Sequence, residues 1–307
     1  MNLTKVDWLA FRTQASVPEA IDAVRAAFGS LGGAIGAKPR KRGLNGFQQA
    51  ADLQLDGMQV GLMQYGGESQ KGWIHVGITG RGCEWIKDWE EADHAVARLE
   101  RFQYRRVDIA FDTYKREVTH DKVVAAHGSG KFTTNGKPPK INCHIPGDPY
   151  DGRTAYIGTR DSEKFLRAYE KGFEIAKGFP ASILKTIGGV PIEDIYRLEL
   201  ELKPNKSALP EDIIEKRDQY FSGAYPYLHE VLQAEPEVWS RRREKGPQVD
   251  LEAALAHIKF QYGTTLFTAL AAYGGDVGAV WERIVGSEHS DRLLRSGVML
   301  VEHGDSL

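Results

Sequence analysis

The chain has few cysteines and no long apolar run, and each absence excludes a class of protein. Its 307 residues include only Cys83 and Cys143, which are far apart and form neither a metal-type pair nor a disulfide framework. No segment approaches the roughly 20 apolar residues needed to cross a bilayer, and the first residues lack a signal-type pattern. We therefore expect a cytoplasmic protein with no membrane role.

Several signatures of nucleotide and metal chemistry are also missing. The sequence contains no GxxxxGK[ST] phosphate loop, and the glycines at 80 and 82 are too few for a dinucleotide fingerprint. It has no zinc-type Cys/His cluster and no Ser/His/Asp or Cys/His set with supporting local context. With a formal net charge of −2, the protein lacks the excess of basic residues that many nucleic-acid-binding proteins have. This charge still allows a local basic groove.

Four short segments alternate apolar and polar residues with period two, which predicts half-buried strands. They are 73–79 (WIHVGIT), 106–112 (RVDIAFD), 165–171 (FLRAYEK) and 197–203 (RLELELK). If these strands share one sheet, its polar face carries a tyrosine, basic residues and several carboxylates.

The order of the remaining elements predicts an α/β (α+β) protein with a central, mostly antiparallel sheet and flanking helices. Besides the four segments, strands are expected at 6–13, 48–55, 58–64 and 154–159, and helices begin near Pro18 and Ala92. The dipeptide Asp56-Gly57 predicts a tight hairpin. From Pro210 onward the pattern is helical, notably over 212–221 and 251–273. We therefore predict a catalytic domain over 1–205 and a helical C-terminal region over 206–307.

Two basic segments are candidates for contacts with a nucleic-acid backbone. Residues 34–46 carry Lys38, Arg40, Lys41 and Arg42 among glycines, and residues 128–152 carry Lys131, Lys137 and Lys140. Both are predicted to be surface loops. Ordinary solvated loops are the alternative interpretation.

Tyr169 is the candidate nucleophile of the predicted polar face. An unperturbed phenol loses its proton only near a pKa of about 10, so a tyrosine nucleophile needs cationic neighbours. Arg167 and Lys171 are two positions to either side of it, on the same face of an extended strand, where they could hold a phosphodiester. The alternative is a solvated sheet face on which Arg, Tyr and Lys have no catalytic role.

Carboxylates on the two flanking strands predict an oxygen-ligand site for Mg²⁺ or Mn²⁺. The candidate ligands are Asp108, Asp112, Glu199 and Glu201. Salt bridges to Arg106, Arg197 and Lys203 are the structural alternative. His75, on the polar face of its own strand, is a candidate for a further ligand or a phosphate contact.

Three segments together resemble a known family: RVDIAFD at 106–112, TAYIGTRDSEKFLRAYEKG at 154–172 and YRLELELK at 196–203. In order and spacing they are similar to the rolling-circle replication initiators of small staphylococcal plasmids, the Rep_trans family, and especially to members encoded by filamentous phages and integrative elements. The resemblance implies that Tyr169 is the DNA-nicking nucleophile and that some of the four acids hold the catalytic ion. Tyr156 matches a family aromatic position without that role.

The resemblance also implies an activity and partners. Expected is a DNA nicking-closing enzyme that cuts one strand at a replication origin through a 5′-phosphotyrosine and later rejoins it. Expected partners are origin DNA, in single-stranded or hairpin form, a host helicase and polymerase, and a second copy of the chain. The sequence lacks the His-hydrophobic-His pair of many nicking enzymes, so a metal would rest on carboxylates. A metal-dependent endonuclease using water and a non-catalytic origin-binding regulator remain alternatives.

Overall fold

The structure, a computed structural model, describes residues 2–134, 136–177, 185–204, 208–237 and 247–287. The chain forms two compact units, residues 1–239 and residues 240–307. The first unit contains the sheet and every candidate site residue. Compact packing therefore continues past residue 205, where the sequence predicts the catalytic domain to end.

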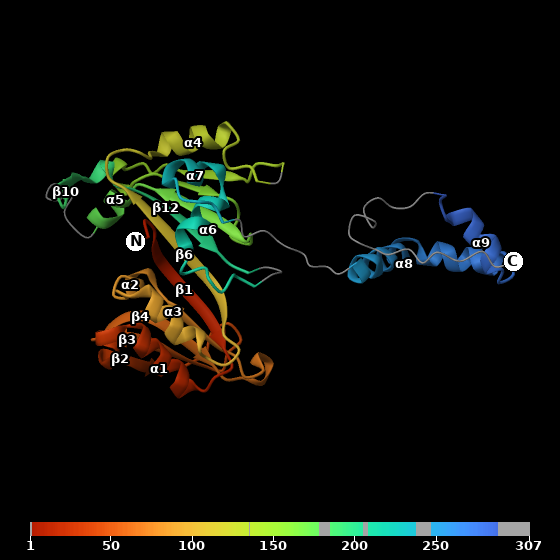
Figure 1. Ribbon diagram of the computed structural model, residues 1–307, viewed down its shortest axis with the longest axis horizontal. Helices are drawn as coiled ribbons and strands as arrows, with labels where there is room; N and C mark the ends of the chain where they lie inside the picture. The colour runs from red at the N-terminus through yellow and green to blue at the C-terminus, as the bar shows by residue number, and fades with distance from the viewer. Residues whose placement is uncertain (1, 135, 178–184, 205–207, 238–246, 288–307) are drawn as a thin grey trace. The chain divides into compact units, whose positions relative to one another are not determined.

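The first unit is built on a ten-stranded sheet in which every pair of neighbouring strands is antiparallel (Figure 1). From edge to edge the order is β2 (Ile35–Pro39), β3 (Gln49–Leu55), β4 (Met58–Tyr65), β5 (Ile74–Ile78), β1 (Lys5–Thr13), β6 (Gln103–Thr113), β12 (Tyr196–Leu202), β9 (Lys164–Tyr169), β8 (Thr154–Ile157) and β7 (Ile141–His144). A separate hairpin pairs β10 (Thr186–Ile187) with β11 (Val190–Pro191). The predicted antiparallel sheet with flanking helices is confirmed.

The large sheet consists of two halves with the same connectivity. In the first half, β1 is followed by a helix and the meander β2-β3-β4, after which β5 inserts between β4 and β1. In the second half, β6 is followed by a helix and the meander β7-β8-β9, after which β12 inserts between β9 and β6. The halves join through the antiparallel pair β1–β6 at the centre of the sheet. The sequence shows no repeat that would have predicted this duplication.

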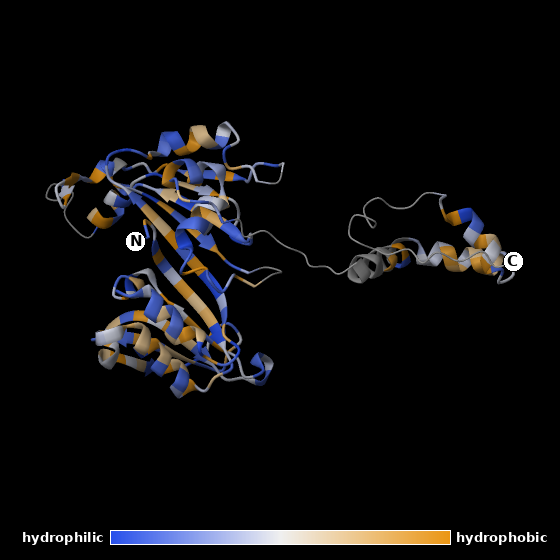
Figure 2. Ribbon diagram, in the orientation of Figure 1, coloured by the Kyte–Doolittle hydropathy of each residue, from blue (hydrophilic) through white to orange (hydrophobic). Residues whose placement is uncertain are grey.

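Helices accompany both halves and contribute to the buried core (Figures 1 and 2). They are α1 (Val17–Ala27), α2 (Gly80–Cys83) and α3 (Trp89–Ala97) in the first half, and α4 (His120–Gly128), α5 (Lys171–Ala176), α6 (Arg217–Ala224) and α7 (Pro226–Leu232) in the second. Short 3₁₀ helices are η1 (Gly29–Ala34), η2 (Glu68–Gln70), η3 (Pro149–Asp151) and η4 (Ile192–Asp194).

The first helix after each central strand has the same kind of N-terminal cap. The Ser16 side chain accepts a hydrogen bond from the amide of Glu19, and the Glu19 carboxylate in turn binds Ser16, which completes a capping box for α1. Thr119 accepts from the amide of Lys122 and caps α4. Each helix start is therefore fixed by its own sequence.

Strand alternation places apolar side chains on the helix-covered face and leaves the other face polar. Val107 and Ile109 in β6, like Leu198 and Leu200 in β12, are fully buried in the apolar core. The residues between them turn to the other face, which carries the candidate site. We call this second surface the open face.

The structure differs from the expected local structure in four places. Residues 211–216 form turns and α6 begins only at Arg217, where the sequence predicts a helix over 212–221. Residues 35–39 form the edge strand β2, so Lys38 does not lie in a loop. Within 128–152, residues Ile141–His144 form the other edge strand, β7. Strand β9 ends at Tyr169, and Lys171 is the first residue of α5 instead of a strand residue.

The end of the first unit is fixed to its beginning by a buried hydrogen-bond cluster. Asp218 in α6 accepts bonds from the backbone amides of Leu3 and Thr4 and from the Thr4 hydroxyl, at 2.7, 2.9 and 2.5 Å. Arg217 also donates to the Thr4 carbonyl. Helix α6 is thus held against β1, which explains why the compact unit includes residues after the last sheet strand.

The second unit contains α8 (Pro247–Ala272) and α9 (Val277–Ile284), where the sequence predicts a helix over 251–273. Asp276 caps α9 through the amide of Ala279. None of the helices in the described part of the chain is long and apolar enough to span a membrane.

Candidate active site on the open face

Strand register places the predicted nucleophile and acids side by side on three neighbouring strands. Within β12, Arg197 stands opposite Tyr169 of β9 and Asp112 of β6. Two residues further along β12, Glu199 stands opposite Arg167 and Ala110, and then Glu201 stands opposite Phe165 and Asp108. Residues that are distant in sequence therefore form one patch, because β12 lies between β9 and β6.

Tyr169 is hydrogen-bonded to a carboxylate. Its hydroxyl donates to Oε2 of Glu199 at 3.1 Å. Burial, and then the negative charge of Glu199, raise the pKa of the Tyr169 phenol, while the positive charge of Arg197 acts in the opposite direction. The phenol is therefore protonated at neutral pH, and Glu199 is the group placed to accept its proton.

The two cations predicted beside Tyr169 differ in their surroundings. Arg167 forms an ion pair with Oε1 of Glu199, the same carboxylate that binds Tyr169. The Lys171 ammonium lies 5.7 Å from the centroid of the Tyr169 ring and 2.6 Å from Oε1 of Glu174. Arg167 is thus connected to the phenol through Glu199, and Lys171 lies over the Tyr169 ring.

Three buried carboxylates lie on β6 and β12 where these strands pair. Asp108, Glu199 and Glu201 are 1%, 2% and 5% exposed. Burial raises the pKa of Asp108 to about 7, and the charges of Glu199 and Glu201 act in the same direction against Arg106. Carboxylates that are costly to ionise together attract cations strongly.

Arginine and lysine side chains supply the cations at this cluster. The Arg106 Nη2 atom lies 2.6 Å from Oδ2 of Asp108 and 3.0 Å from Oε2 of Glu201. Lys203 adds a contact of 2.9 Å to Oε1 of Glu201. The salt bridges that the sequence offered as an alternative to metal binding are thus present in the structure.

Asp112 belongs to a different ion-pair network. Arg197 binds both of its oxygens at 2.6 and 2.9 Å, and Lys5 reaches it at 2.7 Å. Burial alone would raise the pKa of Asp112, but the hydrogen bonds and charges of Arg197 and Lys5 hold it below its usual range. Arg197 also contacts Asp7 at 2.9 Å. Asp112 therefore serves to neutralise Arg197.

The fit of a divalent cation can be judged from the donor groups. In the described residues no three His, Cys, Asp or Glu side chains already converge as a metal-binding group. The trio of Asp108, Glu199 and Glu201 nevertheless offers hard oxygen donors, which Mg²⁺ and Mn²⁺ prefer. A divalent ion would also offset the burial and the neighbouring negative charges that raise the pKa of Asp108. The trio fits such an ion if it replaces Arg106 and Arg167, whereas Asp112 is held by its own partners.

Strand β1 contributes side chains that the sequence reasoning missed. The register of β1 against β6 shifts between Val6 and Trp8, which marks a bulge at Asp7. Asp7 reaches Arg197, and the Trp8 ring lies 4.9 Å from the Arg106 guanidinium. Strict period-two counting cannot place these residues because a bulge changes the phase of the strand. In the sequence, only the polar residues Lys5 and Asp7 within an otherwise apolar segment indicated this contribution.

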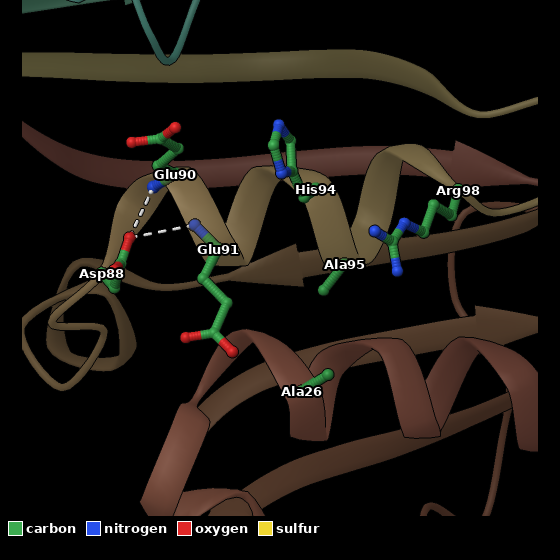
Figure 3. Close-up of a pocket in the computed structure, with 7 residues that line it drawn as sticks. All are labelled: Ala26, Asp88, Glu90, Glu91, His94, Ala95 and Arg98. Carbon is green, nitrogen blue, oxygen red and sulfur yellow. Dashed lines mark hydrogen bonds between the residues drawn. The ribbon is translucent and has the colours of Figure 1, made fainter.

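A surface hollow of about 560 Å³ between α1 and α3 is separate from this chemistry (Figure 3). It is lined by Ala26, Asp88, Glu90, Glu91, His94, Ala95 and Arg98. Asp88 accepts hydrogen bonds from the amides of Glu90 and Glu91 and so caps α3. None of the predicted site residues lines this hollow, and the Asp88 carboxylate already has a structural role as the cap of α3.

A comparison with protein families matches residues 103–268, more than half of the chain, to the family described as replication initiation factor, Rep_trans. The chain belongs to this family. The matched region begins with β6 and contains every residue of the predicted nicking site, including Tyr169 and Glu199. The first half of the sheet lies outside it.

The fold of this Rep_trans member is also found in a solved structure. The rolling-circle replication initiator protein from Geobacillus stearothermophilus matches with a TM-score of 0.55 and 20% sequence identity. The match covers 76% of this chain and 99% of that chain. At this identity the likeness concerns the fold alone. No curated protein sequence matches this Rep_trans chain.

Proposed function

We propose that this replication initiation factor nicks and rejoins one DNA strand at a rolling-circle origin, with Tyr169 as nucleophile. The observation that carries the proposal is the hydrogen bond from the Tyr169 hydroxyl to Glu199, on the strand that also carries the acidic cluster. It joins the candidate nucleophile to a candidate base. Membership of the family supports the same reading.

In the first step of the proposed reaction, Glu199 assists the attack of Tyr169 on the DNA. Glu199 accepts the phenol proton while the Tyr169 oxygen forms a bond to the scissile phosphorus. The bond from phosphorus to the 3′ oxygen breaks, and that oxygen takes a proton from solvent. The products are a 5′-phosphotyrosyl bond and a 3′-hydroxyl, and attack by a 3′-hydroxyl in the reverse direction rejoins a strand.

The cations of the site hold the phosphate during this exchange. Arg167 is 36% exposed at its side chain, so it can turn from Glu199 to a phosphate oxygen. Lys171 lies against the face of the Tyr169 ring and balances charge at the end of the strand. Asp108, Glu199 and Glu201 would hold Mg²⁺ or Mn²⁺, which when bound neutralises phosphate oxygens.

The proposal extends to partners. Origin DNA is the expected substrate of a replication initiation factor. The host helicase, the polymerase and a homodimer remain predictions from the sequence resemblance.

Covalent attachment to DNA tests the proposal. Single-stranded origin DNA labelled on the 3′ side of the cut is incubated with protein and Mn²⁺ and separated on a denaturing gel. We expect a labelled protein adduct, absent in Tyr169→Phe. Tyr156→Phe is the matched control, because Tyr156 lies on the neighbouring strand opposite Arg167, and it should keep the adduct.

The same gel separates the alternatives. Cleavage that gives free 5′ ends in both the parent protein and Tyr169→Phe would indicate a nuclease using water. Binding without cleavage in any divalent ion would indicate a non-catalytic regulator. An adduct that persists in Tyr169→Phe would assign the nucleophile to another residue.

A further inference from the structure

The two halves of the sheet are related by an approximate twofold axis at the pair Trp8–Asp108. On either side of this pair the β1–β6 register is symmetric. Val6–Ile109 and Lys5–Ala110 follow on one side, and Leu9–Val107 and Ala10–Arg106 follow on the other. Together with the shared connectivity, this symmetry lets each position of the nicking half be matched to one in the first half.

The cross-strand pairs give the equivalent residues. At the matching strand ends, Thr13 pairs with Ile74 and Thr113 pairs with Tyr196. Counting from these pairs through β5–β4 and β12–β9, the equivalents are Arg12 for Asp112, His75 for Arg197, Gly77 for Glu199, Leu62 for Arg167 and Gln64 for Tyr169. The first half therefore has an amide in place of the nucleophile and no acid at either matched acidic position.

The opposite end of the central ladder, where β5, β1 and the first residues of β6 lie together, instead gathers nitrogen-bearing side chains for which the described residues show no acidic partners. Arg12 donates to the Gln103 side chain at 2.9 and 2.7 Å, and its guanidinium lies 4.2 Å from the centroid of the Trp73 ring. Within the described part of the chain, neither Arg12 nor Arg105 forms an ion pair with a carboxylate. Arg12 is paired with His75 across the β1–β5 ladder.

These groups influence one another electrostatically. Burial, then Arg105 and Arg12, lower the pKa of His75. Burial and the charge of Arg12 also lower the pKa of Arg105. Cations that disfavour each other's charge, with no acid to balance them, form a site that an anion would stabilise.

The nicking half has the opposite balance. Arg106 is paired with Asp108 and Glu201, Arg167 with Glu199, and Arg197 with Asp112 and Asp7. Among the arginines of the described strands β1, β6, β9 and β12, only Arg12 and Arg105 therefore lack a carboxylate partner, and both lie towards the end of the β1–β6 ladder away from Asp112.

We propose that Arg12, Arg105, His75 and Trp73 form an anchoring site that binds a phosphate of the same single DNA strand that Tyr169 cleaves. This inference rests on the proposed function for the identity of the strand. Because the anchoring site has Gln64 and Gly77 where the nicking site has Tyr169 and Glu199, it holds the strand without cutting it.

The two proposed sites lie towards opposite ends of the central β1–β6 ladder. Tyr169 in β9 is level with Asp112 of β6, and His75 in β5 is level with Gln103. Four strand spacings of roughly 19 Å across the sheet and nine residue steps of roughly 30 Å along β6 place the sites on the order of 35 Å apart. The half-buried Trp8 lies between them, where its ring covers Gly77 at 3.8 Å from the position of an added Cβ. Aromatic faces beside a basic track are typical of single-strand binding sites.

Binding of oligothymidylate tests the anchoring site without requiring cleavage. Affinity for fluorescent dT of about 6 and about 16 nucleotides is measured by anisotropy over a range of salt concentrations, in the parent protein and in Arg12→Gln/Arg105→Gln. For the longer strand we expect about tenfold weaker binding and a log–log salt slope smaller by about 1.4, since each phosphate contact contributes about 0.7. The shorter strand should lose less.

Two control proteins make the result specific. Arg98→Gln/Lys87→Gln removes the same charge from exposed positions at and before α3, and it should bind like the parent. Arg12→Lys/Arg105→Lys keeps the charge and should keep most of the salt slope. If the lysine variant loses as much as the glutamine variant, an altered fold explains the loss and the proposal is wrong.

The outcome is independent of the nicking assay. Unchanged affinity and salt slope in Arg12→Gln/Arg105→Gln would overturn the anchoring site even if Tyr169 forms its adduct. Conversely, loss of oligothymidylate binding together with a persistent adduct in Tyr169→Phe would support the anchoring site and overturn the nucleophile assignment.

Discussion

Tyr169 and Arg167 share one carboxylate: the phenol binds Oε2 of Glu199 and the guanidinium binds Oε1. In the proposed mechanism, the candidate nucleophile, its candidate base and a candidate phosphate-binding cation are thereby linked before DNA binds. A phosphate that draws Arg167 away leaves Glu199 with one partner fewer. The carboxylate would then keep its hydrogen bond with the Tyr169 hydroxyl.

Glu199→Gln should slow adduct formation by about 10²- to 10⁴-fold, the usual contribution of a general base. The amide can still accept the Tyr169 hydrogen bond, but it cannot take up the proton. The remaining rate should rise with pH, because hydroxide then supplies the base. Single-turnover adduct formation measured between pH 6 and 9 checks this. A variant with the parent rate would show that Glu199 only positions the phenol.

Asp108→Asn should weaken Mn²⁺ binding at least about tenfold, whereas Asp112→Asn should leave it unchanged. Asp108 belongs to the buried trio, while Asp112 is bound by Arg197 and Lys5. Electron paramagnetic resonance of free Mn²⁺ during a protein titration measures this without relying on cleavage. Equal weakening in both variants would place Asp112 among the ligands after all.

Arg197→Met should lower the free energy of unfolding by about 3–5 kcal/mol, because it leaves Asp112 and Asp7 without their buried partner. Urea denaturation followed by circular dichroism measures the change. Arg116→Met is the control: its ion pair with Asp194 spans 3.6 Å and its side chain is 63% exposed, so the loss should be about 0–1 kcal/mol. Similar losses in both proteins would contradict this account of Arg197.

Binding of oligothymidylate should strengthen as pH falls from 7.5 to 6, because a phosphate near His75 raises the pKa that burial, Arg105 and Arg12 lower. Proton uptake then accompanies binding. For folding of the free protein, the lowered pKa of His75 acts in the opposite direction. As the pH falls below about 6.5, the unfolded chain binds more protons than the folded chain, so the free energy of unfolding decreases. His75→Gln should flatten both profiles. Anisotropy and thermal unfolding at several pH values measure them.

Much of the fold could be predicted from sequence because its signals are local. Alternation in 106–112 and 197–203 identified two central strands, and Asp56-Gly57 identified the β3–β4 hairpin. The end of β9 could not be predicted in this way, since FLRAYEK continues the alternation past Tyr169. Its end depends on non-local contacts, because Arg153 binds the Glu170 carboxylate and Gly172 donates to the Ile195 carbonyl.

The sequence predicted which residues belong to the candidate site, but it did not predict which of them contact one another. Spacing placed Asp108 and Asp112 on one face of a strand, but only register separates them into the metal-type trio and the Arg197 network. The duplicated halves could not be predicted, because Gln64 and Tyr169 share a position in the fold and no chemistry. The equivalence of these two positions follows from the pairing of the backbone strands and cannot be seen in the residue types.

The β1–β6 ladder also limits how the protein can move. Its backbone hydrogen bonds run through the middle of a continuous sheet. The two halves therefore cannot separate by a hinge motion unless these central hydrogen bonds break. A DNA strand that bound both proposed sites would therefore have to adapt its own conformation to a fixed spacing between them.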